Sequence, residues 1–145
     1  MDNIKEELIK MLNTGLELEH AARIQYLTHA KLIKGPNTEK LIERLKEIAS
    51  DECEHEVILR DLITDYLGGE PSMDMAETNW ANETKKILEV NLKNEKNAVD
   101  LYKQIYAKIH ENREDLKYEF STLEHDMRHI MIDEEEHIVE LSGLM

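Results

Sequence analysis

The sequence predicts an all-α protein, a four-helix bundle made of two antiparallel hairpins that a long crossover joins. Three observations predict this fold. Apolar residues recur at spacings of three and four through four long stretches, and no stretch shows the alternation of a strand. Only 5 Gly and 2 Pro interrupt the 145 residues, so the elements must be few and long. The one long segment rich in helix-breaking residues lies in the middle of the chain.

The boundaries of the first two helices come from turn residues. Gly35 and Pro36 end the first apolar pattern, and Thr38 is a candidate N-cap for the second helix. The second pattern ends in the segment YLGGEPSMDM. Together with a polar turn at HENRED, these breaks predict four helices in a single domain, 1–145, at about residues 3–34, 38–66, 78–111 and 115–142.

The middle connection decides between two orders of helices. Residues 67–77 reach at most about 36 Å when extended. That length is close to the length of the bundle, so this segment could cross from one end to the other. A bundle with short up-down connections fits the same length, and both orders remain open at this point.

Composition narrows the class of function. A net charge of −14 and a pI near 4.9 argue against nucleic-acid binding and suit the attraction of cations. The single cysteine, Cys53, allows no disulfide within the chain. The N-terminus lacks the features of a signal peptide, and no apolar run approaches the ~18 residues of a membrane span. We therefore expect a cytoplasmic protein with no membrane partner.

Three Glu-x-x-His pairs occur, and they differ in their surroundings. Glu17 and His20 continue a polar stripe and are expected on a solvated face. The other two pairs, Glu52 with His55 and Glu134 with His137, fall on the apolar stripes of the second and fourth helices. A carboxylate and an imidazole on such a stripe are costly without partners. Residues three apart share a helix face, so each pair offers one oxygen and one nitrogen ligand to the same point.

Two further carboxylates complete a predicted dinuclear metal site. Glu19 and Glu95 lie on the apolar stripes of the first and third helices, and each is followed two turns later by a tyrosine, Tyr26 or Tyr102. In an antiparallel hairpin, residues at one height are equally far from the turn. The midpoint of 19 and 52 falls between Gly35 and Pro36, and that of 95 and 134 falls in HENREDL. All six ligands are therefore expected at one height, with Glu19 and Glu95 as bridging carboxylates.

The ligand set favours two iron ions per subunit, although manganese or zinc would also fit. Carboxylate oxygens with one imidazole per metal suit all three, and mixed oxygen and nitrogen ligation allows iron to cycle between ferrous and ferric states. Asp51 and Asp133, which precede Glu52 and Glu134, either orient the imidazoles or lie on the surface. Tyr26 and Tyr102 either cap the buried carboxylates or supply an electron.

These residues resemble the ferritin-like di-iron superfamily, and most closely bacterioferritins and rubrerythrins. ELEHAARIQYLTHA is similar to the first-helix signature, DECEH and DEEEH are similar to the motifs of the second and fourth helices, and YLGGEPS resembles the start of the crossover. The resemblance implies oxidation of ferrous iron by dioxygen or hydrogen peroxide at six ligands, with Glu52 and Glu134 as the bridging pair. Cys53 replaces the haem-ligating Met of bacterioferritins, so we expect a buried thiol and no haem by that route.

Three functions remain open from the sequence. The leading one is a ferroxidase in iron storage or detoxification. The others are a rubrerythrin-like peroxide reductase, which would need a separate electron donor, and a metal-binding bundle without redox chemistry. Ile24 and Leu27 interrupt the polar side of the first helix and predict a homo-oligomer, at least a dimer. The sequence ends about three residues after the fourth predicted helix, without the fifth helix that helps to close a bacterioferritin cage, so a dimer and a cage of 12 or 24 subunits both remain open. Gln25 and His29 are expected to be structural, His125 and His129 to be exposed.

Overall fold

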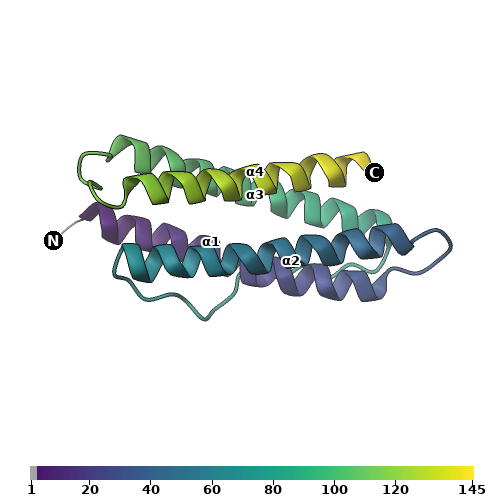
Figure 1. The fold of residues 1–145 in the computed structure, drawn as a ribbon. Coiled ribbons are helices and arrows are strands. Elements are labelled where there is room, and N and C mark those ends of the chain that lie inside the picture. Colours follow the sequence, from purple (N-terminus) through teal and green to yellow (C-terminus); the bar gives the residue numbers. More distant parts are fainter. Residues whose placement is uncertain (1–2) are drawn as a thin grey trace.

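The computed structural model describes residues 3–145, so the first two residues of the predicted domain lie outside it. Four long helices and no strand form in this part of the chain, which confirms the predicted fold class (Figure 1). None of these helices is long and apolar enough to cross a bilayer. The elements are α1 (Asn3–Leu32), α2 (Glu39–Asp61), a π-helical turn η1 that continues α2 (Leu62–Tyr66), α3 (Thr84–Glu111) and α4 (Phe120–Gly143).

The four helices pair as two hairpins. α1 packs along α2 and α3 packs along α4, and the hairpins meet through contacts of α1 with α3 and of α2 with α4. The turns of the two hairpins lie at opposite ends of the bundle, and the crossover runs from one end to the other (Figure 1). The predicted topology of two antiparallel hairpins and a long crossover is confirmed, and the up-down order is not adopted.

The crossover is longer than predicted, because α3 begins at Thr84 rather than near residue 78. The reason lies in α1, whose side chains bind the backbone of the segment that precedes α3. The backbone amide of Asn79 donates to Gln25 Oε1 (2.6 Å), and its carbonyl oxygen lies 3.0 Å from His29 Nε2. These contacts hold the backbone near Asn79 outside a helix, although the sequence pattern predicts that the third helix has already begun there.

The turns account for the other differences in helix bounds. α4 begins at Phe120 rather than near residue 115, because residues 112–119 form turns that bury Leu116 in the core. The first turn contains Gly35 at φ 115°, a left-handed conformation that glycine adopts without strain. Thr38 occupies the predicted N-cap position of α2, but its hydroxyl donates to the Gly35 carbonyl and does not cap the helix.

The interior consists of two apolar clusters on either side of a polar layer. One cluster contains Leu8, Leu16 and Leu59 and reaches Tyr102. The other contains Leu45 and Leu88 and reaches Tyr26, among others. Burial of these apolar side chains stabilises the bundle, and the two clusters border the polar layer on either side.

Candidate metal centre

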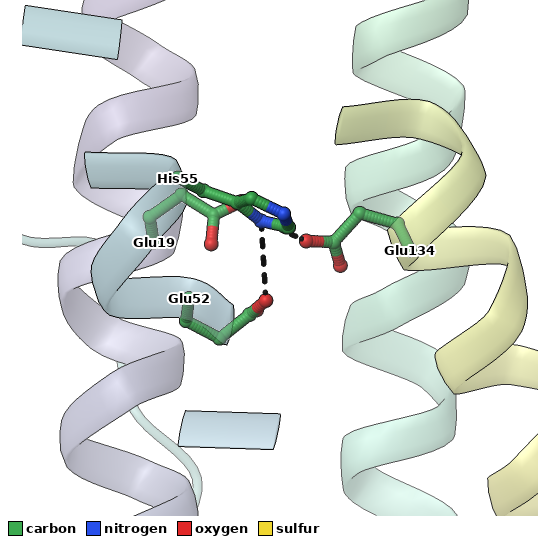
Figure 2. A group of neighbouring side chains, drawn as sticks. All are labelled: Glu19, Glu52, His55 and Glu134. Atoms are coloured by element: carbon green, nitrogen blue, oxygen red, sulfur yellow. Dashed lines mark ion pairs between the residues drawn. The ribbon is translucent and has the colours of Figure 1, made fainter. Parts of the chain in front are cut away.

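Six acidic and imidazole side chains from all four helices form the polar layer. They fall into two groups whose ligand atoms lie within 4.8 Å of one another, and both groups contain Glu52 and Glu134. Figure 2 shows the first group, in which side chains of α1, α2 and α4 point toward one another. All six residues are buried, and they are the six that the sequence spacing predicted: Glu19, Glu52, His55, Glu95, Glu134 and His137.

Each imidazole presents Nδ1 to the carboxylates. His55 Nδ1 lies 2.9 Å from Glu134 Oε1, 3.4 Å from Glu52 Oε1 and 3.6 Å from Glu19 Oε1. In the second group, His137 Nδ1 lies 3.4 Å from Glu95 Oε1 and 3.7 Å from atoms of both Glu52 and Glu134. One nitrogen and three carboxylates therefore converge at each of two neighbouring points.

The shared carboxylates differ from those expected from spacing alone. Spacing suggested that Glu19 and Glu95 bridge, but Glu52 and Glu134 belong to both groups, as the family resemblance implies. The tyrosines explain the difference. Tyr102 Oη donates to Glu19 Oε1 and Tyr26 Oη donates to Glu95 Oε1, both at 2.7 Å. The outer carboxylates therefore have one oxygen occupied, whereas both oxygens of Glu134 lack a hydrogen-bond partner.

An aspartate from the opposite hairpin holds each imidazole. Asp133 Oδ2 lies 2.9 Å from His55 Nε2, and Asp51 Oδ2 lies 2.9 Å from His137 Nε2. Because Nε2 is held by the aspartate, Nδ1 faces the carboxylates and is the ring nitrogen available to a metal ion. Metal-binding histidines in proteins are held in this way. Of the two roles left open for the aspartates, the structure shows contact with the imidazoles.

The unbonded atoms test whether this layer fits metal ions. Among residues 3–145, seven buried side-chain nitrogen and oxygen atoms lack a hydrogen-bond partner, and all seven belong to the six residues of the layer. His55 Nδ1 is one of them, because its close approach to Glu134 lacks the alignment of a hydrogen bond. Unbonded buried polar atoms are costly. Their concentration at one point, with oxygen and nitrogen donors together, fits two divalent cations.

Crowding of the carboxylates perturbs their ionisation. Burial, followed by repulsion from neighbouring carboxylates, raises the pKa of Glu52 and of Glu95 well above the usual range. Burial opposes protonation of His137, but the nearby carboxylates of Glu134 and Glu95 outweigh it and raise its pKa to about 11. Burial also raises the phenol pKa of Tyr26 and Tyr102, so both remain donors. Without a metal, protons would balance the charge in this layer.

The third Glu-x-x-His pair does not lie on a solvated face, contrary to expectation. The crossover covers it: His20 is buried, and its Nδ1 lies 2.6 Å from the carbonyl oxygen of Asp74. Ser72 Oγ donates to Glu17 at 2.6 Å. The pair is absent from both ligand groups of the described chain. It instead helps to attach the crossover to α1.

Sequence reasoning missed a buried charge beside this pair. Glu56 is buried and accepts hydrogen bonds from Arg23 and Arg60. Arg60 also contacts Nε2 of His20, at 2.7 Å. The only sequence signal was the spacing of four between Glu56 and Arg60, which is common on exposed helix faces. Glu56 also contacts Arg23 and His20 of α1, which local spacing on α2 could not reveal.

The other residues considered from the sequence lie outside the two ligand groups. Gln25 and His29 are buried and share hydrogen bonds with Asn91, which agrees with a structural role. His125 and His129 are exposed, as expected, although His129 lies 3.5 Å from Asp133. Cys53 is exposed and not buried, because its position on α2 points away from both apolar clusters.

Known proteins share this fold and parts of the sequence. A ferritin-like, di-iron-carboxylate protein of Bacillus anthracis is 25% identical, covers 99% of each chain and superposes with a TM-score of 0.91. A Rhodobacter capsulatus bacterioferritin, whose structure has a metal-free dinuclear site and a haem iron, gives a TM-score of 0.83 at 22% identity, over 95% of this chain and 82% of that one. That likeness concerns the fold alone.

Sequence similarity extends to curated proteins. The bacterial ferritin of Neisseria meningitidis serogroup B is 32% identical over 100 residues, which are 68% of this chain and 64% of that protein. The match thus spans less than two thirds of the length of this relative. The ferritin-like domain family matches residues 9–145. With the fold and the buried carboxylate–histidine layer, this match shows that the chain belongs to the ferritin-like domain family.

Proposed function

We propose that the six residues of the polar layer hold two iron ions, and that the protein oxidises ferrous iron with dioxygen or hydrogen peroxide. This is the activity of a bacterioferritin-like ferroxidase, and it would serve iron storage or detoxification. One observation carries the proposal: in the part of the chain that the structure describes, all seven unbonded buried side-chain nitrogen and oxygen atoms belong to these six side chains, in two groups that share Glu52 and Glu134. Hydrogen bonding within the protein does not satisfy this layer, but a pair of cations would.

The protein's residues would divide the work between binding and positioning. Glu52 and Glu134 would contact both ions, whereas Glu19 with His55 and Glu95 with His137 would each complete one site. Four carboxylates balance the charge of two divalent ions. Tyr102 and Tyr26 hold one oxygen of each outer carboxylate, which leaves the other oxygen directed at a metal. Asp133 and Asp51 hold Nε2 of each imidazole, so that Nδ1 faces the position of a metal.

Bound iron would supply the electrons. Two ferrous ions give two electrons to one hydrogen peroxide, which takes up two protons and becomes two waters. The apolar clusters on either side of the layer exclude bulk water from this step. Metal binding would displace protons from Glu52 and Glu95, whose raised pKa values hold them in the metal-free protein.

The proposal is tested by loading the metal-free protein with ferrous iron under anaerobic conditions and adding oxidant in a stopped-flow instrument. We expect two irons per chain and rapid oxidation by dioxygen or peroxide. Glu52→Ala and Glu134→Ala should lose this activity. Glu54→Ala and Glu136→Ala are matched controls, since both side chains are exposed neighbours of the ligands. Oxidation at the parental rate in both ligand variants would refute the site assignment.

Two outcomes would point to the other functions. Repeated turnover of peroxide with an added reductant, without retention of ferric iron, would identify a peroxide reductase. Tight binding of zinc or manganese without oxidation of iron would identify a metal-binding bundle. We also propose that the protein is a homo-oligomer, at least a dimer, because Ile24 and Leu27 are exposed on α1 (39% and 44%).

A further inference from the structure

A cavity of about 60 Å³ borders the metal centre on the side where α1 meets α3. Four of its lining residues are the carboxylates of the centre, Glu19, Glu52, Glu95 and Glu134. Others belong to the surface: Glu77 and Asn97 are exposed, and Ala76 and Asn94 are partly so. The cavity therefore connects the buried carboxylates with the outside of the bundle.

The outer end of this cavity opens into a larger surface groove. The groove encloses about 810 Å³ between the crossover and α3. It shares five lining residues with the cavity: Leu18, Ala76, Glu77, Asn94 and Asn97. Glu77 is the one carboxylate among these shared residues.

The opposite side of the centre is closed by the imidazoles. There the rings of His55 and His137 stand between the central carboxylates and the outer aspartates, and Asp133 and Asp51 hold their Nε2 atoms at 2.9 Å. A metal ion that entered from this side would have to break one of these contacts. Neither imidazole lines the cavity on the α1–α3 side.

Every charged side chain that lines the cavity is a carboxylate, the kind of ligand that binds hard divalent cations, whereas Lys86 and Lys93 line only the groove. Asn94 Nδ2 donates to Asn79 Oδ1 at 3.1 Å, which leaves the amide oxygen of Asn94 available. At the inner end, Oε2 of Glu19 and Oε2 of Glu95 are buried and have no hydrogen-bond partner. A cation could therefore exchange its waters stepwise for carboxylate and amide oxygens.

The crossover holds Glu77 at the entrance. The backbone amide of Ala76 donates to the Glu17 carbonyl oxygen at 3.0 Å, and the backbone of Asn79 is bound by Gln25. These anchors lie on either side of Glu77. The attachment of the crossover to α1 thus has a consequence for the metal centre, because it fixes a carboxylate beside the route to it.

We propose that Glu77 captures ferrous ions from solution and that the cavity between α1 and α3 delivers them to the metal centre. The proposal rests on the proposed function, since it supplies the entry route for the same two sites. Glu77 acts before the reaction, so it should affect the rate of metal uptake and leave the number of metals bound unchanged.

The test measures how fast the full-length metal-free protein takes up Co²⁺. This divalent ion is chosen because dioxygen does not oxidise it during the assay. Cobalt absorbance followed in a stopped-flow instrument gives the rate, and equilibrium titration gives the stoichiometry. We expect Glu77→Gln to slow uptake about threefold to tenfold at low salt and less at high salt, as for loss of electrostatic steering. Both metals should still bind at equilibrium.

Two further variants separate the effect of losing a charge from the effect of narrowing the cavity. Glu89→Gln removes the same charge from the groove at a residue that does not line the cavity, and it should load at the parental rate. Ala98→Leu places a larger side chain against the cavity without changing the charge, and it should slow uptake at all salt concentrations. Thermal unfolding checks that this variant is folded.

The outcomes distinguish this route from the metal centre itself. If the parent protein binds two Co²⁺ and Glu77→Gln loads as fast as Glu89→Gln, the entry route is wrong and the metal centre stands. If the parent protein binds no Co²⁺, the proposed metal centre fails and the route fails with it.

Discussion

The two hairpins carry the same metal-binding pattern but differ elsewhere. In the register set by Glu19 and Glu95, Tyr26 matches Tyr102, and the Asp-Glu-x-x-His motif of α2 repeats in α4. Outside this pattern, α1 has buried polar residues where α3 does not. The counterparts of His20, Gln25 and His29 on α3 are Lys96, Leu101 and Ile105.

The crossover explains why only one hairpin needs these polar residues. It lies against α1, and its backbone has hydrogen-bonding groups that must be satisfied where they are covered. His20 and His29 contact the carbonyl oxygens of Asp74 and Asn79, and Gln25 accepts from the Asn79 amide. The candidate metal site therefore accounts for what the hairpins share, and the path of the chain accounts for how they differ.

The largest expected effect concerns the ligand pattern that both hairpins contain. Glu52→Ala and Glu134→Ala each remove a carboxylate common to both ligand groups, so each should lose binding of both metals. Glu19→Ala and Glu95→Ala remove a residue of one group only, and each should retain one metal at higher affinity than the other. Equilibrium titration of the metal-free variants with Co²⁺ measures the stoichiometry.

Glu54→Ala, an exposed neighbour on α2, should bind two metals like the parent. Loss of both metals in all four ligand variants would contradict the distinction between shared and outer carboxylates. It would show instead that the four carboxylates act as one unit.

The next largest effect concerns the hydrogen bonds that Asn91 of α3 makes with the buried polar residues of α1. Asn91 accepts from Gln25 at 2.8 Å and contacts His29 Nδ1 at 2.9 Å. Asn91→Leu leaves Gln25 Nε2 and His29 Nδ1 buried without a partner, so it should lower the free energy of unfolding by about 2–4 kcal/mol. Ile105→Val, at the apolar counterpart of His29, should cost only about 1 kcal/mol. Urea unfolding of the metal-free proteins compares them, and equal losses would refute the special role of the polar network.

Sequence predicted the shared pattern well because its geometry is local. Ligands three apart on one helix, and two helices that meet at a recognisable turn, place Glu19, Glu52 and His55 at one height without further information. The start of α3 and the burial of His20 were mispredicted because both depend on contacts between segments far apart in the chain. Asp74 and Asn79 carry no local signal that α1 side chains will bind their backbone.

A smaller effect should appear in the dependence of stability on pH. Burial lowers the pKa of His29, and the carbonyl oxygen of Asn79 offsets this only in part. As pH falls below about 6.5, the unfolded chain binds a proton at this residue before the folded protein does, so stability decreases. Above that pH the contribution is fully present. Ile105, its counterpart, does not titrate.

Urea midpoints of the metal-free protein at pH 7.5 and 5.5 measure this effect. The parent should lose more stability on acidification than His29→Gln. His125→Gln is the control, because its imidazole is exposed. The same loss in the parent and in His29→Gln would exclude His29 as the source.

The smallest effect on folding should come from the outer face of α1, where the hairpins again differ. Ile24 and Leu27 are exposed, and their counterparts on α3 are the charged residues Asp100 and Lys103. If the apolar pair forms a subunit contact, Ile24→Asp with Leu27→Lys should dissociate the oligomer, because charges would be buried without partners. The unfolding free energy of the isolated subunit should change by only about 0.5 kcal/mol, as for exposed positions. Analytical ultracentrifugation measures the dissociation of the oligomer. Urea unfolding at low protein concentration measures the unfolding free energy of the subunit. An unchanged sedimentation coefficient would place the subunit contact on another face and leave the exposed pair without this role.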